Sequence, residues 1–138
     1  MKFRARVRTA ALLLVGSSTL AGCGGHNQAL SALESDPMAT ATFSHTTLTR
    51  EDKQGSGTTL GKPVHAMITR RFSYDGVTDQ ALVEQAASLA QQNGWKTEFS
   101  RPTSFTGTKT IDQVKASITI TTSDLAGGQA FFIYLTAE

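Results

Sequence analysis

The side chains that most often carry catalysis or bind metals are few and scattered in this chain. Its histidines, His26, His45 and His65, are about twenty residues apart in sequence, and they form no cluster with cysteines and carboxylates of the kind that a metal site needs. A zinc site needs three or four ligands that converge on the ion. Serines are numerous, but none lies in the Gly-x-Ser-x-Gly elbow of a hydrolase nucleophile. We therefore expect no metal, no cofactor and no nucleophilic triad.

One group of carboxylates, Asp75, Asp79 and Glu84, is close enough in sequence to suggest an acid–base pair. Such a pair also needs a cleft and a shifted pKa. Each member has a simpler role: Asp75 in a turn, Asp79 in the first turn of a helix, and Glu84 on the exposed side of that helix. The glycine-rich segments 55–57 and 127–128 lack the following lysine-bearing helix that a phosphate loop requires. The sequence thus predicts a protein that is not an enzyme.

Two adjacent arginines, Arg70 and Arg71, could pair with an anion or with an acidic partner. Neighbouring residues on a strand point to opposite faces of the sheet. We therefore expect both arginines to be solvated, and they give little support for an anion site.

The N-terminal segment carries the clearest signal in the chain. Residues 1–8 are short and basic, residues 10–16 form a small apolar run, and residues 17–19 are small and polar. This order is typical of an export signal that is removed after translocation. The apolar run is far shorter than the roughly 20 residues of a membrane-spanning helix. The single cysteine of the chain follows directly, in the sequence Leu20-Ala21-Gly22-Cys23.

This tetrad resembles the lipobox of bacterial lipoproteins, in which a diacylglycerol is attached to the cysteine sulfur and a dedicated signal peptidase cuts just before that cysteine. The resemblance implies that the peptidase recognises Leu20, Ala21 and Gly22, and that Cys23 carries the lipid, with palmitate as a typical acyl chain. It also implies a protein anchored to the extracytoplasmic face of the cell membrane. The alternative is an ordinary secretory signal followed by a cysteine that occurs there by chance.

The basic pI of the whole chain, about 8.9, arises in that segment. Lys2, Arg4, Arg6 and Arg8 lie in it, whereas all 11 acidic residues lie downstream. The remainder, 23–138, is therefore mildly acidic, and a surface for nucleic acid is not expected. Without a pair of cysteines this exported part must be held together by packing alone.

The signal peptide at 1–22 is expected to precede a lipidated cysteine and flexible tether at 23–38. Gly24 and Gly25 suit a tether because they cannot pack. Residues 28–35 could form one or two helical turns, which Asp36-Pro37 would end. A single domain is expected over 39–138.

Within that domain, threonine-rich residues 40–49 could form a short strand, and the charged, glycine-containing segment 50–62 predicts an exposed loop. The clearest helix is expected over 79–93, with Thr78 as its N-cap and Asn93-Gly94 at its end. Alternation of apolar and polar residues predicts strands at 64–74, 95–99, 114–121 and 129–136, with 105–110 beginning another.

These elements predict an α+β fold: a small two-layer domain with one main helix on an antiparallel sheet of about four strands. The order of helix, Gly-Trp and meander is similar to that of small uncharacterised actinobacterial lipoproteins, over roughly the last half of the chain. That resemblance implies a fold and a location, and no activity.

One helix would leave the other side of the sheet open. Phe132 and Tyr134, which alternate with Phe131 and Ile133, could form a binding face there, unless the aromatics only enrich the core. We expect a non-enzymatic binding module with an envelope protein as partner. The alternatives are a small-molecule or lipid-binding module, for which so small a domain leaves little room for a cavity, and a small envelope hydrolase. Nothing in the sequence indicates an oligomeric state.

Overall fold

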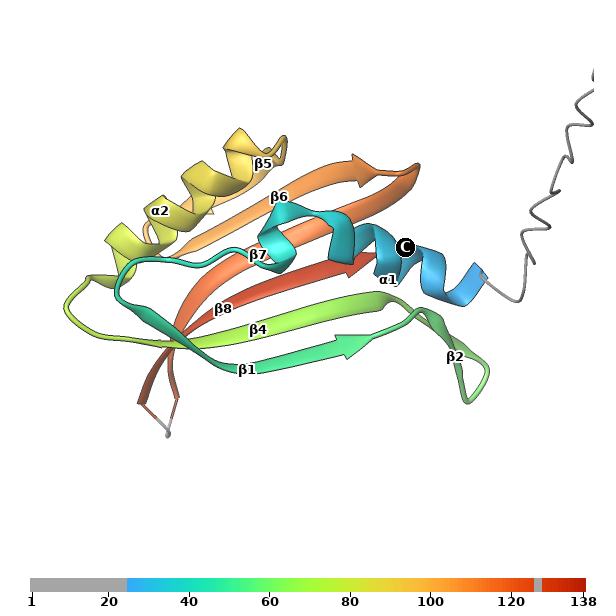
Figure 1. Cartoon of the computed structure of the whole chain (residues 1–138), viewed down its shortest axis with the longest axis horizontal. Helices are drawn as coiled ribbons and strands as arrows, with labels where there is room; N and C mark the ends of the chain where they lie inside the picture. The colour runs from blue at the N-terminus through green and yellow to red at the C-terminus, as the bar shows by residue number, and fades with distance from the viewer. Residues whose placement is uncertain (1–24, 126–127) are drawn as a thin grey trace, which may run out of the picture.

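The structure, a computed structural model, describes residues 25–125 and 128–138 (Figure 1). The signal peptide, the Leu20-Ala21-Gly22 recognition sequence and Cys23 lie outside the described residues. The helical elements are α1 (Gly25–Ser35), η1 (Pro37–Ala39) and α2 (Asp79–Gln92). The strands are β1 (Thr46–Gln54), β2 (Gly57–Thr59), β3 (Lys62–Val64), β4 (Ala66–Tyr74), β5 (Lys96–Arg101), β6 (Ser104–Ile111), β7 (Val114–Leu125) and β8 (Gly128–Ala137).

Six of these strands form one antiparallel sheet in the order β1-β4-β8-β7-β6-β5, and β2 pairs with β3 in a separate hairpin. Helices α1 and α2 both pack on the same face of the sheet, α1 over β4, β7 and β8 and α2 over β6 and β7 (Figure 1). The predicted fold of one main helix on about four strands is therefore wrong, since the described part has eight strands and two α-helices. The additional elements are an edge strand, a hairpin and a helix whose sequences carry weak periodicity.

The core lies between the six-stranded sheet and the two helices. Every second residue of β4, β7 and β8 faces it, as the alternation in sequence predicted. Three phenylalanines pack edge-on at one end, with ring centroids 5.8 Å apart for Phe43 and Phe72 and 5.4 Å apart for Phe43 and Phe131. The largest fully buried side chains are Phe72, Phe105, Phe131, Leu33, Met38, Ile68, Leu82, Ile118, Ile120, Ile133 and Leu135.

Helix α2 forms where the sequence predicted it. The side chain of Thr78 accepts a hydrogen bond from the amide of Ala81 at 3.2 Å, which caps the N-terminus. After the C-cap at Asn93 the chain reverses at Gly94, whose φ of 88° lies in the left-handed region that glycine tolerates best. The predicted cap and stop are both confirmed.

Helix α1 corrects the expectation of a flexible tether. Ala29, Ala32 and Leu33 are buried against the sheet, and Met38 in η1 is fully buried. The helix ends at Ser35 because Asp36-Pro37 follows, as expected. The mean hydropathy of this segment is near neutral, so the sequence alone does not indicate that one side of the helix is buried against the sheet.

Strand β1 and the β2–β3 hairpin replace the loop that was predicted over 50–62. All residues of β1 beyond Thr46 are exposed, so the strand shows no alternation of burial for the sequence to reveal. At the hairpin tip Leu60 and Gly61 both have positive φ, 51° and 75°, as a two-residue type I′ turn requires. The side chain of Leu60 is 98% exposed.

In the other edge strand, β5, the alternation predicted for 95–99 would place Trp95, Thr97 and Phe99 inward. Trp95 is buried as expected, but Thr97 and Phe99 are exposed. A register shift between Thr97 and Phe99 breaks the alternation there.

Among the described residues, no helix has the length and apolar character needed to cross a bilayer.

Candidate binding face

The sheet surface opposite the helices, called here the open face, carries the side chains that alternate with the core residues. Phe132 and Tyr134 lie on it, in the middle of β8. Their rings are stacked, with centroids 5.6 Å apart and planes 8° from parallel. Both side chains are half-buried, so the pair forms a firm, partly accessible apolar patch.

Polar side chains surround this aromatic pair. The guanidinium of Arg71, which is opposite Phe132 in β4, lies 5.8 Å from the Phe132 ring centroid. Tyr134 is flanked by Thr69 on β4 and Thr119 on β7. An aromatic patch with a cation and hydroxyls at its border has the composition of a protein-binding surface rather than of a core.

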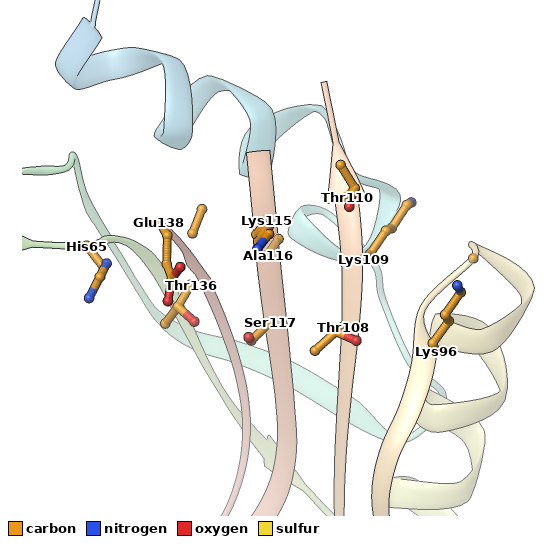
Figure 2. Close-up of a pocket in the computed structure, with 12 residues that line it drawn as sticks. His65, Lys96, Thr108, Lys109, Thr110, Lys115, Ala116, Ser117, Thr136 and Glu138 are labelled. Atoms are coloured by element: carbon orange, nitrogen blue, oxygen red, sulfur yellow. The ribbon is translucent and has the colours of Figure 1, made fainter. Parts of the chain in front are cut away.

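The open face is hollowed at one end, where a cavity of about 750 Å³ lies across β5, β6, β7 and β8 (Figure 2). We call it the end cavity. Thr108, Ser117 and Thr136 lie side by side on neighbouring strands in its floor. Lys96 stands at one side of this row and His65 at the other (Figure 2). A hollow of this size was not expected in so small a domain.

Lys109, which also lines the end cavity, forms an ion pair with the buried carboxylate of Asp36. The Lys109 Nζ donates to Asp36 Oδ2 at 2.6 Å and to the carbonyl oxygen of Asn93 at 2.6 Å. The other oxygen, Asp36 Oδ1, accepts from the Trp95 indole at 3.2 Å and from the Met38 amide at 2.9 Å. The Asp36 side chain is fully buried. This cluster ties η1, the end of α2 and β6 into one unit.

Arg70 is the second buried charge, and the expectation that it is solvated is wrong. It is 3% exposed, because it faces the core from β4. Its Nε donates to Glu51 Oε2 at 3.1 Å, and one terminal nitrogen donates to the Ala41 carbonyl at 2.7 Å. The guanidinium lies 5.0 Å from the Phe72 ring centroid. Arg70 therefore fixes the chain between η1 and β1 and is not available to a ligand.

The predicted carboxylate cluster does not converge on one site. Asp79 accepts a hydrogen bond from the Tyr74 hydroxyl at 2.6 Å, and Glu84 accepts one from Gln80 on the exposed side of α2. Burial, together with the bond to the Asp79 carboxylate, raises the pKa of Tyr74 well above its usual value.

The histidines are likewise dispersed, since His45 and His65 are exposed and lie on different segments. In the part of the chain that the structure describes, no three His, Cys, Asp or Glu side chains are close enough to share a metal ion.

Sequence reasoning found the aromatic pair but missed the end cavity. Lys96, Lys115 and the three hydroxyl residues are distributed over four strands, and only the strand register brings them together. Lys115 and Ser117 alternate with buried residues of β7, so the sequence did indicate that they share a face.

Comparisons of the chain with models of protein families, with curated proteins and with solved structures found no match.

Proposed function

We propose that this chain is a lipid-anchored extracytoplasmic protein that acts without catalysis, by binding a protein of the cell envelope through its open face. The observation that carries the binding role is the stacked pair of Phe132 and Tyr134 on a sheet surface that neither helix covers. Half-buried aromatics with a cation beside them are the groups that most often anchor protein interfaces.

The anchor is supported by the sequence Leu20-Ala21-Gly22-Cys23 after a short apolar run. Helix α1 begins at Gly25, only two residues after Cys23. A lipid on Cys23 would hold this end of the domain within about 7 Å of the attachment point, because an extended residue spans at most roughly 3.5 Å.

The anchor is tested by growing cells with a clickable fatty acid and following the label and the membrane fraction. We expect the wild-type chain to carry the label and sediment with membranes, and Cys23→Ala to lose the label. A labelled Cys23→Ala chain, or an unlabelled wild-type chain, would reject the anchor.

The partner is tested by placing a photo-crosslinking amino acid at Thr119, beside Tyr134 on the open face. The matched control position is Ser88, which is exposed on α2. We expect a discrete protein adduct from position 119, no adduct from position 88, and loss of the adduct in the Phe132→Ser/Tyr134→Ser variant. Normal display of the protein with no adduct at position 119 would contradict the proposal.

That double variant must also fold if the pair is a binding surface. Because both rings are half-exposed on the open face, we expect the circular dichroism spectrum and cooperative unfolding to be retained. Loss of folding would show that the pair is part of the stabilising core instead.

A second candidate is the binding of a small molecule, and the end cavity favours it. Its volume of about 750 Å³ is within the usual range of ligand sites, roughly 300–1,000 Å³. Its lining indicates which chemistry such a ligand would need.

A further inference from the structure

We infer that the end cavity is a binding site for a phosphate-bearing polyol, such as a glycerol phosphate or sugar phosphate. The inference deepens the second candidate function, and its chemistry does not depend on the lipid anchor. The cavity combines unpaired cations with a row of hydroxyls on a rigid floor.

The cations of the cavity are free to accept an anion. Among the described residues, Lys96 and Lys115 have no carboxylate partner, whereas Lys53 is paired with Glu34 and Lys109 with Asp36. Two acidic side chains are also near: Glu138 lines the cavity, and the Glu98 carboxylate accepts a hydrogen bond from Thr108 at its floor, but neither forms an ion pair with Lys96 or Lys115. Lysine ammonium groups are common ligands of phosphate because they act as compact point charges.

The hydroxyls supply the second half of the site. Thr108, Ser117 and Thr136 follow one another across β6, β7 and β8, at the strand spacing of roughly 4.8 Å. The Thr108 hydroxyl donates to Glu98, while the side-chain hydroxyls of Ser117 and Thr136 have no hydrogen-bond partner within the described part of the chain. The hydroxyls of Ser117 and Thr136 can donate to phosphate oxygens, and all three hydroxyl oxygens can accept from the hydroxyls of a polyol.

The residue types that line the cavity restrict the class of ligand further. Neither phenylalanine, tyrosine nor tryptophan lines the cavity, so it offers no flat surface on which a nucleobase would stack. Polar side chains point into it from several strands, and His65 and Lys96 stand at opposite sides (Figure 2). An extended molecule with an anionic group and hydroxyls fits this arrangement better than a compact apolar one.

The floor is held in place by the ion pair of Lys109. Lys109 is in β6 next to Thr108, and its bonds to Asp36 and to the Asn93 carbonyl hold β6 against η1 and the end of α2. A site on a braced sheet loses little conformational freedom when the ligand binds.

Two sources can present this chemistry. The end cavity, the start of α1 and the β2–β3 hairpin lie at the same end of the domain (Figure 1). If Cys23 carries a lipid, which rests on the proposed function, this end faces the membrane and an anionic glycerophospholipid headgroup can reach the cavity. A soluble glycerol or sugar phosphate is the other source.

The test uses the processed, lipidated protein in phosphatidylcholine nanodiscs, with its threonine methyl groups labelled for NMR. One arm titrates sn-glycerol 3-phosphate, and the other replaces part of the lipid with phosphatidylglycerol. We expect saturable shifts at the methyl groups of Thr108 and Thr136 and none at Thr47 in β1 or Thr58 in the hairpin. Glycerol without phosphate should give no saturable shift.

The variants separate a built site from general charge attraction. Lys96→Gln/Lys115→Gln should weaken binding at least tenfold, while Arg101→Gln, at the opposite end of the same strand as Lys96, should change it less than twofold. Shifts with both probes or with phosphatidylglycerol alone support the headgroup as ligand, and shifts with glycerol 3-phosphate alone support the soluble source.

No saturable shift with either probe, or equal weakening by Arg101→Gln, would overturn the inference. A protein that lacks the lipid and does not load into nanodiscs would instead refute the anchor. The glycerol 3-phosphate arm, run on that protein in solution, would still decide the site.

Discussion

Asp36 and Lys109 are 73 residues apart in the chain, yet their side chains meet at 2.6 Å in a place where the carboxylate is fully buried. Two further donors, the Trp95 indole and the Met38 amide, complete the coordination of the carboxylate. Burying a charge is tolerated only when it is paired and hydrogen-bonded to this extent. The cluster therefore specifies where the first helical segment docks on the sheet.

Removing one partner from this cluster should be costly. Asp36→Ala leaves the Lys109 ammonium with no carboxylate and two donors without an acceptor, so we expect a loss of about 3–5 kcal/mol in the free energy of unfolding. Urea unfolding followed by Trp95 fluorescence measures it. Glu34→Ala is the matched control, because its pair with Lys53 is exposed to solvent and should contribute little to the free energy of unfolding. Similar losses in the two variants would contradict this account.

Gly107 occupies a place in β6 where a side chain has no room. A Cβ there would lie 3.0 Å from the Lys96 carbonyl oxygen and 3.3 Å from the Ile118 side chain. We expect Gly107→Ala to destabilise the domain by about 1–3 kcal/mol, measured as a lower urea midpoint. Gly57→Ala in β2, where a Cβ meets nothing within 4 Å, should change stability by less than about 0.5 kcal/mol. Equal losses of stability in the two variants would show that β5 can move away from Gly107 at little cost in free energy.

Stability should fall at alkaline pH through Tyr74. The folded protein favours the neutral phenol, so the pKa of Tyr74 is raised above its unfolded value of about 10. The resulting stabilisation is complete below pH about 10 and is lost as the pH rises toward the folded pKa. Tyr74→Phe should cost about 1 kcal/mol at pH 8 and less at pH 11, where the wild-type protein has itself lost stability. A difference that is independent of pH would refute the raised pKa.

The hairpin tip should become more stable when Leu60 is replaced. Its φ of 51° is unfavourable for leucine, and its side chain is 98% exposed. Asparagine tolerates this conformation, so Leu60→Asn should stabilise the hairpin by about 0.5–1 kcal/mol. Amide hydrogen exchange of Thr59 and Lys62 should slow by about two- to fivefold. Faster exchange would mean that the leucine makes a contact with something that holds the turn.

Strongly periodic elements were predictable from the sequence. The burial of Ile68 and Phe72 in β4, and of Ile118 and Ile120 in β7, follows from apolar residues at every second position. The N-cap of α2 at Thr78 was recognisable for a local reason, since its partner is three residues away. Periodicity and helix caps depend on residues that are close together in the chain, so both can be predicted without knowledge of the fold.

The failures share the opposite cause, because they depend on residues that are distant in sequence. Strand β1 is exposed throughout and is a strand only because β4 lies beside it. In the sequence Arg70 resembles a surface residue, because its hydrogen-bond partners, Glu51 and the Ala41 carbonyl, are far from it in the chain. The alternation of residues along β8 was enough to predict that Phe132 and Tyr134 share a face. The end cavity could not be predicted in this way, because it forms only when four strands pair in a particular register.

The two edges of the six-stranded sheet are unfit to pair with another chain. Strand β1 has a register shift between Leu48 and Arg50 and then a run of charges, and β5 has a shift between Thr97 and Phe99 with Arg101 stacked on the Phe99 ring. Irregular, charged edges resist the strand-to-strand association that drives aggregation. If the proposed lipid anchor confines the protein to a surface, where neighbours meet far more often than in bulk solution, such edges would let many copies crowd together and remain separate molecules.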